Sequence, residues 1–269
     1  MTELSKTLSE AHYSDLIEVG GLREGVTRAL EAAGSSLRAT TVPAFIPFAR
    51  VGQGSRFTQI YAAAGRRLFT LEFWFDGVAY GSGSTPDVGE AAASAHAWAL
   101  EGPGIALMKE RFGFFTPSGR GEAHEAGSLV EYLWGELLRR WEDSDRRHGG
   151  TPSPTPLIRA AMLRPELRRL YPYTSLYSLG FSRTGYPFTN DCPSAAPHGD
   201  GLYRAYSHRY EVVKRRHRDR EYQVTEHEIL GEGTVEEVLD LLVADLPPGR
   251  GAAANGTPED VSNAGREGV

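Results

Sequence analysis

The amino-acid sequence predicts an α+β protein made of two halves, each combining helices with an antiparallel sheet. Three observations lead to this class. Between Arg66 and Leu100, a strand-like alternation, a tight turn, glycines and a helical pattern follow one another. A shorter copy of the second part of this stretch returns between Tyr222 and Pro247. The two copies are separated by a charged and then proline-rich segment, which is typical of a linker.

The first copy begins with a strand whose apolar residues share one face. Large apolar side chains recur at every second position: Phe69, Leu71, Phe73 and Phe75. A period of two is that of a half-buried strand. Asp76-Gly77 predicts a two-residue hairpin turn, because both positions of that turn need positive φ angles. We expect the return strand to end in a glycine loop, Gly81-Ser82-Gly83, and Ser84 or Thr85 to cap the following helix.

The second copy carries a clearer helix start. Thr234-Val235-Glu236-Glu237 is a capping box, in which the Thr hydroxyl and the last Glu carboxylate each satisfy a free backbone amide. Apolar residues at helical spacing follow, and Pro247 ends the pattern. The preceding Gly231-Glu232-Gly233 predicts a second glycine loop. Phosphate binding at either loop is disfavoured, because the lysine of the GxxxxGK[ST] pattern is absent and the second loop carries a carboxylate.

The predicted domain organisation places an N-terminal α+β domain at residues 1–143, a linker at 144–156 and a C-terminal α+β domain at 157–250. Residues 251–269 are small and polar, which predicts a disordered tail. The clearest helix, Ser128 to Glu142, has an apolar stripe of Leu and Trp residues opposite its charged residues. Such a stripe is typical of core packing, and a face that docks a partner is the alternative.

Composition bounds the possible functions. The chain has 269 residues, of which 40% are hydrophobic and 24% charged, as in ordinary globular proteins. The formal net charge of −6 argues against general nucleic-acid binding. The single cysteine, Cys192, excludes an intramolecular disulfide and a cysteine-rich metal site, and it favours a reducing, cytoplasmic location. No apolar run reaches the about 20 residues that span a bilayer, so we expect no membrane partner. The dispersed histidines form no HExxH or HxH pair, and we expect no metal and no cofactor.

The densest polar cluster lies in the second half of the chain. Its guanidinium, phenol, amide and carboxylate groups are of the kind that orient a substrate or bind a peptide. The same segments, TGYP, NDCP and HGDG, are also ordinary turn sequences, and turn formation is the more common role. A thiolate nucleophile at Cys192 is disfavoured, because a lone cysteine is more often simply packed. No catalytic residue is identified. The candidate residues for binding a substrate or partner are Arg183, Tyr186, Thr189, Asn190, Asp191, His198 and Asp200.

A basic run, KRRHRDR from Lys214 to Arg220, is the strongest local contrast with the acidic chain. It separates two predicted strands, Tyr210 to Val213 and Tyr222 to Ile229. We interpret the run as a solvated hairpin loop, and the alternative is a surface that grips an acidic peptide, a nucleotide or RNA. No aromatic residue is interleaved within the run, which disfavours RNA.

Several segments of the chain resemble an uncharacterised bacterial family described as natural-product biosynthesis proteins. They are LYSLGFSRTGYPFTNDCP, GDGLYRAY, LGEGTVEEVLDLLVADLPPGRG and NGTPEDV in the second half, and GVAYGSGSTPDVGEAAASAHAWAL in the first. The basic run and the linker depart from the resemblance, which transfers no catalytic residue. It implies a context: the biosynthesis of a specialised metabolite, often a modified ribosomal peptide such as a lanthipeptide.

Two hypotheses of different classes follow. In the first, a non-catalytic accessory protein of that pathway binds a precursor peptide or a partner modifying enzyme, and exposed β-prone segments add a peptide strand. In the second, a tailoring enzyme of the same pathway has its site in the loop between Arg183 and Asp200. A small-molecule carrier is a third possibility. The missing catalytic signatures favour the first hypothesis.

Overall fold

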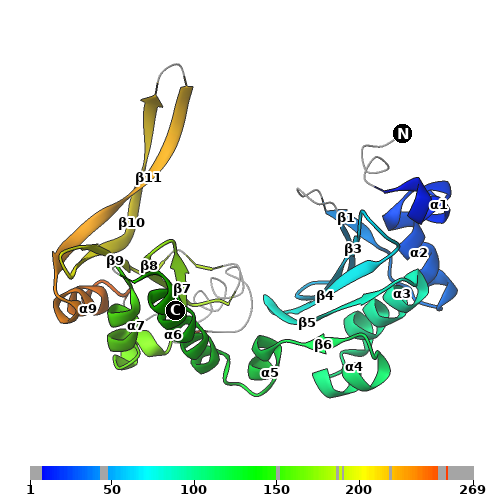
Figure 1. Cartoon of the computed structure of the whole chain (residues 1–269), viewed down its shortest axis with the longest axis horizontal. Helices are drawn as coiled ribbons and strands as arrows, with labels where there is room; N and C mark the ends of the chain where they lie inside the picture. Colours follow the sequence, from blue (N-terminus) through cyan, green and yellow to red (C-terminus); the bar gives the residue numbers. More distant parts are fainter. Residues whose placement is uncertain are drawn as a thin grey trace, which may run out of the picture. The chain divides into compact units, whose positions relative to one another are not determined.

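The computed structural model describes residues 8–42, 48–149, 152–185, 188–189, 191–217, 220–247 and 253. It contains two antiparallel sheets with accompanying helices (Figure 1), which confirms the predicted α+β class. The chain divides into two compact units, unit 1 from Met1 to Gly127 and unit 2 from Ser128 to Val269.

Within the described residues, unit 1 has a six-stranded sheet in which strands that follow each other in sequence are neighbours, in the order β1-β2-β3-β4-β5-β6. The strands are β1 (Thr40–Val42), β2 (Phe48–Gln53), β3 (Arg56–Ala62), β4 (Phe69–Phe75), β5 (Val78–Thr85) and β6 (Thr116–Pro117). The helices are α1 (Glu10–Glu18), α2 (Leu22–Ala32), α3 (Val88–His96), the π-helix η2 (Ala97–Glu101), α4 (Ile105–Arg111) and α5 (Gly119–Glu125).

The predicted hairpin is confirmed and lies within this sheet. β4 and β5 pair antiparallel through a turn in which Asp76 and Gly77 have φ angles of 49° and 76°. Phe69, Leu71 and Phe73 are buried, as their alternation predicts. Helix α3 packs against β2, β3, β4 and β5. The apolar face of the hairpin is therefore covered by a helix of its own unit.

The first predicted glycine loop is part of a strand. Gly81 and Gly83 lie inside β5, which continues to Thr85. A Cβ atom at Gly81 would lie 2.6 Å from the ring of Phe115, and one at Gly83 would lie 2.6 Å from the ring of Phe114. The glycines are therefore required by a close approach of another segment and not by a turn.

The cap of α3 also differs from the prediction. The Asp87 carboxylate accepts hydrogen bonds from the backbone N–H groups of Gly89 and Glu90, at 2.6 and 3.3 Å. Thr85, one of the two predicted caps with Ser84, instead donates to the Glu90 carboxylate at 2.6 Å. A charged cap also interacts favourably with the positive end of the helix dipole, which a hydroxyl does less strongly.

In the part of unit 2 that the structure describes, five strands form one antiparallel sheet in the order β11-β10-β9-β8-β7. The strands are β7 (Tyr171–Ser175), β8 (Ser178–Ser182), β9 (Ser194–Gly199), β10 (Leu202–His217) and β11 (Arg220–Gly233). The helices are α6 (Leu129–His148), α7 (Thr155–Ala161), α8 (Pro165–Arg168) and α9 (Val235–Ala244). Helices and sheet share one core, whose buried members include Trp134, Ile158, Phe181, Ala205 and Leu239.

The division between the two units falls earlier in the chain than the sequence predicted. Unit 2 begins at Ser128 instead of residue 157. Helix α6 runs on to His148, so the start of the expected linker is helical. The expected linker, residues 144–156, therefore lies inside unit 2.

The apolar stripe of α6 explains this difference. Trp134 and Leu137 on the stripe are buried in the core of unit 2. The Trp134 indole N–H donates a hydrogen bond to the Leu170 carbonyl at 3.2 Å. The stripe is thus core packing, and it holds α6 in the C-terminal unit.

The basic run belongs to two strands and not to a loop alone. β10 continues through Lys214 to His217, and β11 begins at Arg220. The second predicted glycine loop, Gly231 to Gly233, is likewise the end of β11. Both strands are longer than predicted because they pair with each other from Tyr203 and Gly233 out to His217 and Arg220, interrupted by a register shift between Tyr206 and Tyr210.

The predicted capping box at the start of α9 is confirmed. The Thr234 hydroxyl accepts from the backbone N–H of Glu237 at 3.5 Å, and the Glu237 carboxylate accepts from the backbone N–H of Thr234 at 2.8 Å. The tail expected over residues 251–269 lies outside the described residues, apart from Ala253, whose N–H donates to the Arg169 carbonyl at 2.8 Å.

Candidate functional site

β10 and β11 extend beyond the other strands of their sheet as a two-stranded ribbon (Figure 1). We call the arm the part in which residues 210–217 pair with residues 220–227 in an unbroken antiparallel register. β9 pairs with β10 only between Leu202 and Tyr206. Among the described residues, the strands of the arm therefore pair only with each other. At about 3.3 Å per residue, the arm is about 25 Å long.

One face of the arm carries apolar side chains in contact with solvent. Tyr210 and Val212 of β10 are 50% and 54% exposed, and Ile229 at the base of β11 is 53% exposed. Residues opposite each other in a ribbon share a face, as do residues two apart along one strand. Tyr210 pairs with His227, which lies two positions before Ile229. All four side chains therefore lie on one face, which we call the apolar face.

The opposite face of the arm is acidic near the sheet. Glu211 and Glu226 stand directly opposite each other across the two strands. Like charges in such positions destabilise a ribbon. Farther out, the sequence of β10 becomes basic, with Lys214, Arg215 and Arg216 in succession. The arm thus changes from acidic at its base to basic at its outer end.

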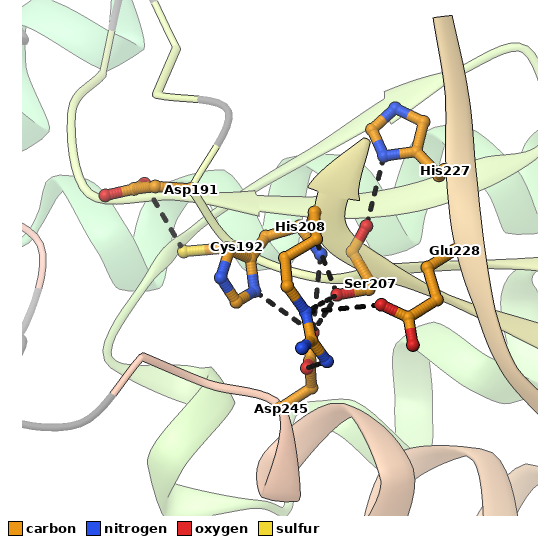
Figure 2. A network of polar contacts seen from close by, with 8 residues as sticks. Asp191, Cys192, Ser207, His208, His227, Glu228 and Asp245 are labelled. Carbon is orange, nitrogen blue, oxygen red and sulfur yellow. Dashed lines mark hydrogen bonds and ion pairs between the residues drawn. The ribbon is translucent and has the colours of Figure 1, made fainter. Parts of the chain in front are cut away.

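The arm leaves the sheet at a bulge that one carboxylate holds in place (Figure 2). The pairing of β10 with β11 shifts register between Tyr206 and Tyr210. At the end of α9, the Asp245 carboxylate accepts from the Ser207 hydroxyl at 2.8 Å and from the His208 backbone N–H at 3.3 Å. The His208 ring Nδ1 lies 3.0 Å from the same oxygen. The Asp245 side chain is only 10% exposed. A carboxylate with several donors is a strong anchor, so α9 fixes the direction in which the arm departs.

Ser207, His208 and Asp245 do not form a nucleophilic triad. In a triad, the hydroxyl donates to the histidine and the histidine donates to the carboxylate. Here the Ser207 hydroxyl donates to Asp245 itself, and its oxygen accepts from the backbone N–H of Arg209 at 3.1 Å. Ser207 is also buried. The cluster is therefore a structural junction.

The structure brings two predicted site residues, Arg183 and Asp191, together as an ion pair. The Arg183 Nε donates to the Asp191 carboxylate at 2.8 Å, and Nη2 contacts the same oxygen. The two side chains are 13% and 21% exposed. A third predicted residue, Thr189, is buried. The Thr189 hydroxyl accepts a hydrogen bond from the backbone N–H of Arg183 at 2.9 Å, and the Thr189 backbone N–H donates one to the Ser182 hydroxyl at 2.8 Å. These contacts hold the shape of the loop from within.

The other described members of the predicted set belong to a different part of unit 2. His198 on β9 accepts a hydrogen bond from Arg204 at 2.6 Å and lies 3.4 Å from the Glu232 carboxylate. Asp200, with a φ of 50°, forms the tight turn into β10. The described candidates thus divide between two polar clusters. Two further candidates lie outside the described residues: Tyr186 and Asn190.

Cys192 lines a very small pocket beside the Arg183–Asp191 pair. The volume of the pocket is about 10 Å³, which is room for about one water molecule. The thiol sulfur lies 3.8 Å from an Asp191 carboxylate oxygen. Burial raises the pKa of the Tyr173 phenol, and the charges of Cys192 and Asp191 raise it further. Among the residues with described positions, no three His, Cys, Asp or Glu side chains are grouped so that they could hold a metal ion.

Unit 1 has a buried polar cluster that its own groups fill. The Arg56 guanidinium stacks over the rings of Phe75 and Trp98, at 4.1 and 4.2 Å from their centroids, and burial lowers its pKa. Next to it, the Tyr80 hydroxyl lies 2.5 Å from His124 Nδ1, and burial raises the pKa of Tyr80 to about 12. The guanidinium occupies the aromatic surroundings that a ligand cation would otherwise take.

Comparison with known protein families gives a match only in unit 2. Residues 128–257 match the model of a family of unknown function, DUF6193. The match begins where unit 2 begins and includes the arm and α9, which supports unit 2 as one module. No curated protein and no solved structure matches the chain. None of the helices with described positions is long and apolar enough to cross a membrane.

The arm and its anchor were not predicted from the sequence. A signal for the arm was present, because the spacing of Tyr210, Val212 and Lys214 continues the strand pattern into the basic run. Asp245 had no comparable signal. It follows α9 directly, and its hydrogen-bond partners lie in a bulge of β10. No local sequence pattern predicts this bulge.

Proposed function

We propose that this chain is a non-catalytic accessory protein of specialised-metabolite biosynthesis, whose arm captures an extended segment of a precursor peptide or of a partner modifying enzyme. The resemblance of the sequence to natural-product biosynthesis proteins supports the pathway, with a lanthipeptide-type ribosomal peptide as the substrate class. The single cysteine supports a cytoplasmic location.

The observation that carries this function is the open edge of the arm. β11 is an edge strand of its sheet, and over the arm the described part of β10 pairs with β11 alone. An open edge presents a row of backbone N–H and C=O groups that can pair with another chain. Strand addition takes its affinity from these groups and its selectivity from the side chains beside them.

The charges of the arm indicate which segment fits it best. Glu211 and Glu226 lie near the sheet, and the basic residues that begin at Lys214 lie farther out. A segment with basic residues toward the sheet and acidic residues toward the outer end would match both halves.

The tailoring-enzyme hypothesis has less support. Arg183 and Asp191 neutralise each other in a mostly buried pair, and Thr189 holds the backbone of the same loop. The pocket beside Cys192 has room for about one water and not for a metabolite.

Removal of the arm tests the proposed function directly. In an arm-less variant, a short Asn-Gly turn replaces residues 210–227 and leaves the pairing of Tyr203 with Gly233 at the base of the ribbon. The variant and the wild type are each co-expressed with the proteins encoded beside the gene and purified by affinity. We expect the wild type to retain one of them and the arm-less variant to lose it, with unit 2 still folded by circular dichroism.

Two controls make the result specific. Leu163→Ser changes an exposed apolar residue outside the arm, and the variant should keep the partner. Arg183→Met tests the loop of the alternative hypothesis. Retention of the partner without the arm, or its loss in the Arg183 variant alone, would refute binding at the arm edge. Hydrogen exchange should locate the protection on an open edge of the arm, in residues 210–217 of β10 or in β11.

A further inference from the structure

The apolar face of the arm is a separate surface from its edges. A two-stranded ribbon has no second layer of its own, and isolated ribbons are at best marginally stable in water. Tyr210, Val212 and Ile229 are each about half exposed on this face. A peptide that pairs with an edge widens the ribbon sideways and leaves this face uncovered. The apolar face therefore needs a cover other than an edge-bound peptide.

The order of residues on this face is complementary to itself. From the base outward, β10 presents Tyr210, Val212 and then Lys214, and all three are exposed. If a second arm packs on this face in the opposite direction, the two valines meet on a two-fold axis. Each lysine ammonium then lies over the tyrosine ring of the other copy, which is a favourable cation–π contact. Parallel packing would instead place lysine against lysine.

The charge distribution along the whole arm favours the same direction. Glu211 and Glu226 are at the base, and the sequence from Lys214 to Arg216 is basic. Glu211 and Glu226 lie on the face that points away from the contact, so the charges act across the ribbons and add a weak preference for antiparallel packing, in which the acidic base of each arm lies near Lys214 of the other. An arrangement with a two-fold axis also closes after two copies.

We infer that two copies of this chain associate through the apolar faces of their arms, antiparallel, about a two-fold axis at Val212. The face of one ribbon is smaller than the surfaces of stable complexes, which bury about 1,200–2,000 Å². We therefore expect a weak dimer that dissociates on dilution.

Thiol trapping tests both the face and the direction. Both variants are made in a Cys192→Ser background. Val212→Cys places a thiol on the proposed axis, whereas Glu211→Cys, at the neighbouring residue, places a thiol on the opposite face of the arm. We expect mild oxidation or a short thiol crosslinker to trap the first variant as a dimer and to leave the second monomeric. A mixture of Tyr210→Cys and Lys214→Cys chains should give mixed dimers in excess over either self-dimer.

Equal trapping of the Glu211→Cys variant would place the contact on the wrong face, and excess Tyr210→Cys self-dimers would mean parallel packing; either overturns the inference. Sedimentation of the unmodified chain up to several hundred micromolar is the independent measurement. We expect dimers that Val212→Glu abolishes, and a chain that stays monomeric also overturns the inference. Val212→Glu leaves the backbone edges of the arm intact. Co-purification of this variant with a partner therefore tests the proposed function separately from dimer formation.

Discussion

The central hairpin of unit 1 and the arm of unit 2 are both antiparallel ribbons with alternating side chains, but their apolar faces meet opposite surroundings. In β4, Leu71 and Phe73 are fully buried, because α3 packs against the sheet. In the arm, Tyr210 and Val212 remain about half exposed, because the described residues supply no covering layer. An alternating pattern of apolar residues therefore predicts a strand, but the layer that packs on its apolar face comes from elsewhere in the chain or from another molecule.

The strongest test of this comparison removes one aromatic side chain from each ribbon. Phe73→Ala deletes a fully buried ring from the core of unit 1 and should lower the free energy of unfolding by about 3–5 kcal/mol. Tyr210→Ala should change the free energy of unfolding by less than about 0.5 kcal/mol in dilute solution. Urea unfolding followed by circular dichroism measures both. A large loss for Tyr210→Ala would mean that the chain itself covers the arm.

The next test concerns the anchor of the arm. Asp245→Ala removes the acceptor of the buried Ser207 hydroxyl and of the His208 backbone, and hydrogen bonds to a charged group contribute about 1.5–3 kcal/mol. We expect unit 2 to lose about 2–3 kcal/mol and the amides at the base of the arm to exchange faster. Asp240→Ala on the exposed side of α9 is the matched control. Unchanged exchange in the Asp245 variant would show that α9 does not fix the arm.

Much of the fold could be predicted because short patterns determine it. The Asp76-Gly77 turn needs positive φ angles, and the capping box at Thr234 satisfies its own amides. The predictions failed where distant contacts decide. Gly81 lies in a strand because Phe115 approaches it from a later segment. The apolar stripe of α6 predicts that the helix is packed in a core, but it does not indicate which unit supplies that core. The predicted boundary between the two domains therefore fell after α6, whereas unit 2 begins at Ser128.

The candidate site was less predictable for the same reason. Arg183 and Asp191 were grouped because they share a loop, and they do contact each other. His198 was grouped with them by proximity in sequence, but it contacts Arg204 on β10. The extent of the arm depends on how far β10 and β11 pair, which no pattern within either strand reports.

A third test asks whether the predicted loop serves structure or binding. The exposure of the Arg183–Asp191 ion pair is intermediate between that of a fully buried pair and that of a surface pair. We therefore expect Arg183→Met to lower the free energy of unfolding of unit 2 by about 1–2 kcal/mol. In a double-mutant cycle with Asp191→Asn, the second change should cost little once the first is present. If the variants keep their stability but lose partner binding, the loop is a binding site and the arm is not sufficient.

The smallest expected effect is a dependence on pH that belongs to unit 1. Two guanidinium nitrogens of Arg67 donate to the Asp15 carboxylate of α1 at 2.7 and 2.8 Å. These hydrogen bonds are the main cause that holds the pKa of Asp15 below its usual value. A lowered pKa in the folded state contributes stability above the unfolded-state pKa of about 3.9, and this contribution is lost as the pH falls below it.

Because the Asp15 side chain is 53% exposed, solvent screens the pair, and we expect Asp15→Asn to cost about 0.2–1 kcal/mol at pH 7. The difference from the wild type should shrink below about pH 4 and vanish near pH 2, since the wild-type carboxyl is then protonated as well. Glu18→Gln, at an exposed position of the same helix, is the control. Urea unfolding of unit 1 across this range measures the difference. A difference that persists unchanged at pH 2 would mean that Asp15 stabilises α1 by packing and not through its charge.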